Sequence, residues 1–161
     1  MNGEQPDDKE IERWRKAAAK NDVNAMTNLG LVAAGLDRVE GEDSAESWWI
    51  AAAAKGGADA MFNLGVLRFE AERTIGHDSA AYWWDNAARV GHDDAMVNLG
   101  LIRQNQGRLS GPESAEYWWE RAAEAGNLDA THNLDELRME RETAAPNETI
   151  VGLSSRPDER R

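Results

Sequence analysis

Four asparagines recur at one place in an apolar helical pattern: Asn28, Asn63, Asn98 and Asn133. The side chain of asparagine offers both an amide donor and a carbonyl acceptor. An extended peptide also presents one donor and one acceptor per residue. A ladder of asparagines on stacked helices could therefore hold a peptide main chain. A structural alternative stays open, in which each asparagine hydrogen-bonds a neighbouring helix or loop, as buried polar groups usually do.

The residues beside each asparagine extend this pattern along one helix face. Asp59, Asn63, Val66 and Glu70 are spaced i, i+4, i+7 and i+11 and therefore form one line. The equivalent lines supply apolar residues at Leu31, Val66 and Leu101, and acids at Asp59, Asp94 and Asp129. We expect the apolar side chains to contact a ligand and the aspartates to favour a basic one.

These lines belong to an internal repeat. The pairs Trp48-Trp49, Trp83-Trp84 and Trp118-Trp119 are spaced 35 residues apart, and Trp14 lies 35 residues before Trp49, so all seven tryptophans fit one grid. The Asn-Leu-Gly triplets at 28–30, 63–65 and 98–100 follow the same spacing. A period of this length predicts a repeat array whose core is built between neighbouring units.

Each repeat contains two predicted helices. The first type carries an apolar stripe, as in Ala60, Leu64 and Leu67, and is predicted at about Val23–Ala34 and Leu128–Arg141 among others. The second type follows an acid- and serine-rich cap, carries the tryptophan pair between alanines, and ends near Gly56, Gly91 or Gly126. Asn21 stands in for this glycine after a helix predicted over Glu10–Lys20.

The repeat grid divides the chain into three parts. Residues 1–8 are predicted to be a flexible leader and residues 143–161 a flexible tail. Residues 9–142 form the repeat domain, with a half repeat, three full helix pairs and a C-terminal capping helix. In that last helix Asp135 and Glu136 replace Gly100 and Leu101, as a solvent-facing cap requires.

Composition restricts the partners. The net charge is -12, from 30 acidic and 18 basic residues. Nucleic-acid affinity depends on Lys and Arg, so this charge opposes nucleic acid and suits a neutral or basic partner. The chain has no cysteine, and it shows neither a signal peptide nor an apolar run of the ~20 residues that span a membrane. A cytoplasmic location is the default expectation, and the oligomeric state is left open.

The motifs Ala-x-x-Asn-Leu-Gly and Ala-x-x-Trp-aromatic-x-x-Ala-Ala-x-x-Gly closely resemble the Sel-1-like repeat, a branch of the tetratricopeptide superfamily. The resemblance covers about residues 9–142. It implies an all-α fold, a right-handed α-solenoid of antiparallel helix pairs in which the asparagine line faces the concave groove. It also implies a non-catalytic adaptor or scaffold that binds a protein or an extended peptide. The alternative is a regulatory or structural subunit that docks on a larger enzyme or complex through its convex face or C-terminal tail.

Other residue types suggest weaker hypotheses. The tryptophans are interpreted as core fillers because they lie between small residues at helical spacing. A row of Arg68, Arg103 and Arg138 could bind a carboxylate, although solvated arginines that counter nearby acids are the favoured interpretation. His77, His92 and His132 are far apart on the grid, so we predict no metal site, no cofactor and no enzymatic activity.

Overall fold

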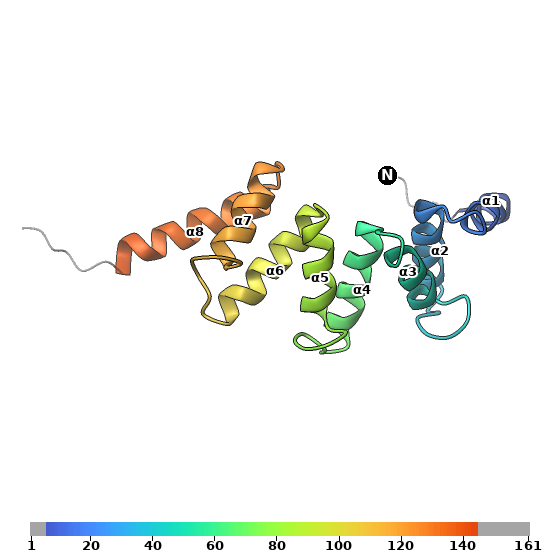
Figure 1. The fold of residues 1–161 in the computed structure, drawn as a ribbon, viewed down its shortest axis with the longest axis horizontal. Helices are drawn as coiled ribbons and strands as arrows, with labels where there is room; N and C mark the ends of the chain where they lie inside the picture. The colour runs from blue at the N-terminus through green and yellow to red at the C-terminus, as the bar shows by residue number, and fades with distance from the viewer. Residues whose placement is uncertain (1–5, 145–161) are drawn as a thin grey trace, which may run out of the picture.

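The computed structural model describes residues 6–144, which form eight α-helices arranged in series (Figure 1). The helices are α1 (Asp8–Ala18), α2 (Val23–Gly35), α3 (Ala45–Ala53), α4 (Ala58–Glu70), α5 (Ala80–Arg89), α6 (Asp93–Asn105), α7 (Ala115–Glu124) and α8 (Leu128–Ala144). Each helix packs mainly against the helices before and after it in the chain. The predicted α-solenoid is confirmed. We call α2, α4, α6 and α8 the A helices, and α3, α5 and α7 the B helices.

The two outer helices differ slightly from their predicted bounds. Helix α1 begins at Asp8, inside the predicted leader, because Asp7 caps it by accepting a hydrogen bond from the Glu10 amide at 2.7 Å. Helix α8 continues to Ala144, three residues past the predicted end and into the predicted tail. Arg141, the residue before this extension, ties the end of α8 to α7 by donating a hydrogen bond to Glu116 at 2.7 Å. Residues 1–5 of the predicted leader and 145–161 of the predicted tail lie outside the described residues.

Local capping explains why the B helices begin where they do. Ser44, Ser79 and Ser114 are each only 1% exposed and accept a hydrogen bond from the backbone amide three residues later, at 3.1, 3.2 and 3.2 Å. These bonds satisfy an amide of the first turn that has no helical partner. At the opposite ends, Gly91 has a φ of 100° and Asn21 a φ of 68°. The predicted substitution of asparagine for glycine is therefore confirmed.

The core follows the predicted stripe and the predicted alanines. Ala60 and Leu64 of α4 and Ala95 and Leu99 of α6 are 0% exposed. In α8, Ala130 alone of the stripe is 0% exposed. The tryptophans are also buried or partly buried, as predicted: Trp49, Trp84, Trp118 and Trp119 are at most 6% exposed, while Trp14, Trp48 and Trp83 are partly buried.

The second tryptophan of each pair makes the closest contact between helices. Its indole nitrogen donates a hydrogen bond to a carbonyl of the preceding A helix: Trp49 to Thr27 at 3.3 Å, Trp84 to Phe62 at 3.2 Å and Trp119 to Val97 at 3.1 Å. The ring covers a glycine three residues further on, at Gly30, Gly65 and Gly100. A Cβ atom placed there would lie only 2.3, 2.3 and 2.2 Å from the indole. The glycine of the Asn-Leu-Gly triplet is thus required for docking.

A Gly100→Ala substitution tests this docking by the sign of its effect. In a helix without a neighbour, alanine is favoured over glycine by about 1 kcal/mol. Here the added methyl meets the Trp119 ring, so we expect the free energy of unfolding to fall by about 2 kcal/mol. The measurement is urea denaturation followed by circular dichroism.

Asp135→Ala is the matched control, because Asp135 occupies the equivalent place in α8 and is exposed. It should leave stability unchanged or raise it slightly. A Gly100→Ala variant as stable as the natural chain would show that the indole does not need the glycine.

Candidate functional site

The N-terminal ends of successive A helices lie next to one another. His92, which precedes α6, stacks on the Phe62 ring of α4 with ring centroids 4.5 Å apart, and its Nε2 lies 3.7 Å from an Asp59 oxygen. Asn127, which precedes α8, donates a hydrogen bond to Asp94 of α6 at 2.9 Å. Equivalent positions on these helices therefore succeed one another along the array.

The four asparagines occupy such equivalent positions, one on each A helix. All four side chains are partly buried: Asn28, Asn63, Asn98 and Asn133. Within residues 6–144, none of their side-chain amides takes part in a hydrogen bond, whereas Asn86 and Asn127 do. Partly buried amides of this kind exchange hydrogen bonds with water, and a ligand can replace that water.

The residues that flank the asparagines are unequally available. Leu31 is 50% exposed and Leu101 40% exposed, while Val66 is partly buried and packs against the core. Asp59, Asp94 and Asp129 are all exposed. The Asp59 side chain is 76% exposed and lies 3.7 Å from His92 Nε2, whereas Asp94 already accepts a hydrogen bond from Asn127. The apolar and acidic positions thus lie beside the asparagines, and Asp59 is more available to a ligand than Asp94.

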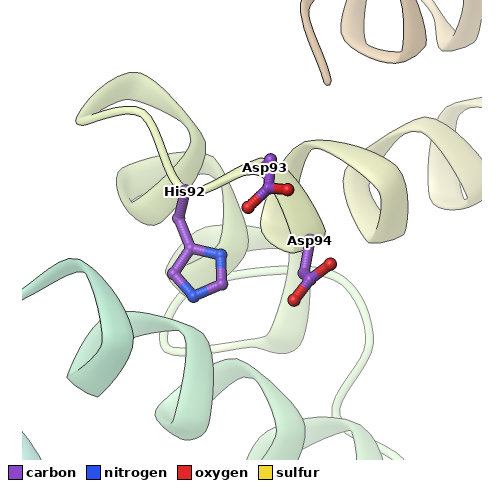
Figure 2. Close-up of side chains that lie close together, drawn as sticks. All are labelled: His92, Asp93 and Asp94. Carbon is purple, nitrogen blue, oxygen red and sulfur yellow. The ribbon is translucent and has the colours of Figure 1, made fainter. Parts of the chain in front are cut away.

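One cluster was missed by sequence reasoning, which judged the histidines too far apart to matter. His92, Asp93 and Asp94 bring one ligand atom each within 4.8 Å of one another at the start of α6 (Figure 2). Three consecutive residues of this type before a helix are the signal that could have revealed it.

The bonds inside this cluster show what it does. His92 Nδ1 accepts a hydrogen bond from the Ala95 amide at 3.3 Å, and Asn127 Nδ2 donates to Asp93 at 3.0 Å. The Asn127 bond lowers the pKa of Asp93 despite a raising effect of burial, and backbone amides at the helix start lower it further. These atoms cap α6 and tie it to α8, because negative charge suits a helix N-terminus. A metal ion there would compete with those bonds.

The arginine prediction is wrong in one important respect. Arg68 is not solvated but only 7% exposed. Its guanidinium donates to Glu46 of α3 and, at 3.1 Å, to Asp78 before α5. Arg103 is partly buried and Arg138 is exposed, with Asp135 at 3.7 Å. The three arginines therefore have different surroundings and do not form a uniform row.

Asp78 is the centre of the network around Arg68. It also accepts hydrogen bonds from the Trp83 indole at 2.7 Å and from Arg73 at 2.8 Å. Burial alone would raise the pKa of Asp78, but the bonds from Trp83, Arg68 and Arg73 outweigh it, so this pKa lies below its ordinary value. The carboxylate is thus held ionised by three donors.

Comparison with solved structures supports the architecture. A Sel1 repeat protein from Oxalobacter formigenes superposes with a TM-score of 0.68 and 26% identity, over 87% of this chain and 59% of that chain. The protective antigen c5321 from uropathogenic Escherichia coli strains, which displays an SLR fold, gives a TM-score of 0.67 and 26% identity, over 82% of this chain and 29% of its own. No protein-family model and no curated protein matches the sequence.

The serial helix pairs and these neighbours define the class as an α-solenoid of repeats that generally serve as non-catalytic protein-binding scaffolds. Within that class the chain has the fold of these Sel1-like repeat proteins. It spans 59% and 29% of the length of the two neighbours. Among residues 6–144, no helix combines the length and apolar character that crossing a membrane demands.

An Asp78→Asn substitution should destabilise the protein in a pH-dependent way. Because the pKa of Asp78 is lowered by folding, its contribution is present above the pKa of the unfolded chain, near 4, and is lost as the pH falls through the lower folded value. We expect a loss of about 2 kcal/mol at pH 7. The difference from the natural chain should shrink below about pH 4 in urea denaturation curves.

Asp43→Asn serves as the control, since Asp43 holds the equivalent place in the first repeat, where Ala33 replaces the arginine. Its effect at pH 7 should be clearly smaller. Equal losses in the two variants, or a gap that persists unchanged in acid, would contradict the role given to the Asp78 network.

Proposed function

We propose that this chain is a non-catalytic adaptor or scaffold that binds an extended peptide segment of a partner along the asparagine line. The observation that carries the proposal is the set of four equivalent amides without hydrogen bonds inside residues 6–144: Asn28, Asn63, Asn98 and Asn133. Each can give one donor and one acceptor to a main chain. Main-chain recognition of this kind supplies affinity, while neighbouring side chains supply selectivity.

Those neighbouring side chains indicate the character of the peptide. Leu31 and Leu101 expose apolar surface beside the line, which suits aliphatic or aromatic side chains of a ligand. Asp59, Asp94 and Asp129 add negative charge to a chain whose net charge is already -12. This charge accelerates association with basic ligands and opposes acidic ones. We therefore propose a neutral or basic peptide that alternates polar and apolar residues, bound on the concave side of the solenoid.

The probe for this function is a displayed library of random linear peptides, selected on the complete chain. The enriched peptides are synthesised, and their affinities are measured by calorimetry against the natural chain and an Asn63→Ala, Asn98→Ala double variant. We expect the double variant to bind about tenfold more weakly or worse, because two main-chain hydrogen bonds are lost. Its thermal midpoint should stay close to that of the natural chain, since those side chains make no bond within the described region.

Two results would count against the proposal. A double variant that loses stability while it keeps full affinity would show that the asparagines are structural. Unchanged affinity in that variant, combined with loss of binding on removal of residues 145–161, would favour docking through the C-terminal segment instead.

Charge reversal at Asp59 tests the preference for basic ligands separately. Asp59 is better suited than Asp94, because Asp94 is bonded to Asn127 and its replacement would disturb the cap of α8. We expect Asp59→Lys to weaken binding of basic peptides and to flatten the dependence of their affinity on salt. Glu72→Lys is the control, since Glu72 is exposed in the connection after α4 and carries the same charge. Equal effects of the two changes would mean that only net charge matters.

A further inference from the structure

The ion-pair network around Arg68 is not repeated around Arg103, and two nitrogen donors there are left without acceptors in the described region. In the second full repeat the Asp78 carboxylate accepts from Arg68 Nε at 3.1 Å, from Trp83 Nε1 at 2.7 Å and from Arg73 Nη2 at 2.8 Å. Arg68 also donates to Glu46. A carboxylate is thus enclosed by three donors of fixed geometry.

The next repeat keeps these three donors but not their acceptors. Arg103, Arg108 and Trp118 lie 35 residues after Arg68, Arg73 and Trp83. Glu113 stands in the place of Asp78, yet its side chain points to Arg89 of α5, from which it accepts a hydrogen bond at 2.7 Å. Ala81 stands in the place of Glu46. Both acidic partners of the buried arginine are therefore missing at Arg103.

Two buried nitrogens are left unpaired as a result. Arg103 Nε and Trp118 Nε1 are shielded from solvent and have no hydrogen-bond partner within residues 6–144, and Trp118 as a whole is 1% exposed. Their counterparts, Arg68 Nε and Trp83 Nε1, are the atoms that hold Asp78. An unpaired buried donor costs roughly 1–3 kcal/mol, and more when it is charged. Within residues 6–144, the buried side-chain nitrogens that lack a partner all belong to this one repeat.

The local charge favours an anion. Burial lowers the pKa of Arg103, and the nearby cations Arg108 and Arg89 lower it further, while Asp85 and Glu113 only partly oppose them. The corresponding pKa of Arg68 is raised, because its bonds to Glu46 and Asp78 outweigh burial. Of these two arginines, Arg103 is therefore the one whose charge is not offset by a bonded acid, and a negative group beside it would be stabilised.

Access is also better here than at Arg68. Arg103 is only partly buried, its Nη1 donates to Gln106 at 3.2 Å, and Arg108 is exposed. Ala81 lacks the side-chain carboxylate that Glu46 places against Arg68. A carboxylate could therefore approach from the side of Arg108, displace Gln106 and reach the two covered nitrogens.

We propose that Arg103, Arg108 and Trp118 form a carboxylate-binding site that takes the C-terminal or side-chain carboxylate of a protein ligand. The bound group would occupy the place that Asp78 fills in the preceding repeat, with the guanidinium groups and the indole N–H as donors. This site is independent of the asparagine line, since it is built from the end of α6, the following connection and α7. It adds a second, acid-specific contact to a surface that is otherwise acidic.

The experiment follows the indole N–H resonances of the complete chain by NMR during titration. The three probes are a short peptide with a free C-terminus, the same peptide amidated, and an amidated peptide with one aspartate. We expect the Trp118 resonance, assigned through Trp118→Phe, to move downfield with either carboxylate and to stay still with the neutral amide. A response to only one of the two carboxylates would identify the source of the ligand group.

A matched variant supplies the missing carboxylates from the protein itself. Ala81→Glu combined with Glu113→Asp restores both acids found around Arg68. This double variant should remain folded, shift the Trp118 resonance without any ligand, and bind the carboxylate probes at least about tenfold more weakly. Its Trp83 resonance, already bonded to Asp78, should not change in any titration.

Three results would overturn the proposal. One is a Trp118 resonance that does not respond to any carboxylate. Another is the same response to sodium chloride at equal ionic strength, which would indicate a general salt effect. The third is a Trp118 resonance that is already shifted in the free protein and returns on Glu113→Gln, because Glu113 would then fill the site itself.

Discussion

The contact on which the array depends is an indole laid against a helix backbone. The second tryptophan of each B helix reaches the preceding A helix, covers a glycine and donates to the carbonyl three residues earlier. Only a residue without Cβ admits the ring at this distance. The bond fixes the indole along the helix axis and the glycine fixes its depth, so two residues set the separation and register of neighbouring helices. The hydrophobic stripe then closes around that point.

This docking also orients the candidate binding line. Asn28, Asn63 and Asn98 each lie between the carbonyl that accepts the indole bond and the glycine that receives the ring. Their side chains therefore occupy equivalent positions on successive helices, and their amides make no hydrogen bond within the described region. A rigid backbone that presents unpaired amides is suited to recognition, because little ordering entropy is lost on binding.

The repeats are equivalent in packing but not in charge. Ser44, Ser79 and Ser114 are buried alike and cap alike, and the docked tryptophans make the same bond three times. The arginines near the C-terminal ends of the A helices, by contrast, have different partners. Within residues 6–144, Arg68 donates hydrogen bonds to two acids, Arg103 donates to no acid, and Arg138 lies near an exposed aspartate. Packing constrains every unit of an array, whereas surface charge is free to vary between units. Individual function is therefore expected in the variable networks.

The sequence alone determined the helix pairs, the caps and the buried faces. These features depend on residue types at short spacing, such as serine before a helix, glycine or Asn21 after one, and an apolar stripe of helical period. It also located the asparagine line, because residues on one helix share a face by geometry. Only the tertiary structure decided which glycine receives which indole, since Gly65 and Trp84 belong to different helices. It also decided that Arg68 is buried and that Glu113 turns to Arg89, because the choice among several nearby charges depends on side-chain packing in three dimensions rather than on spacing along the chain.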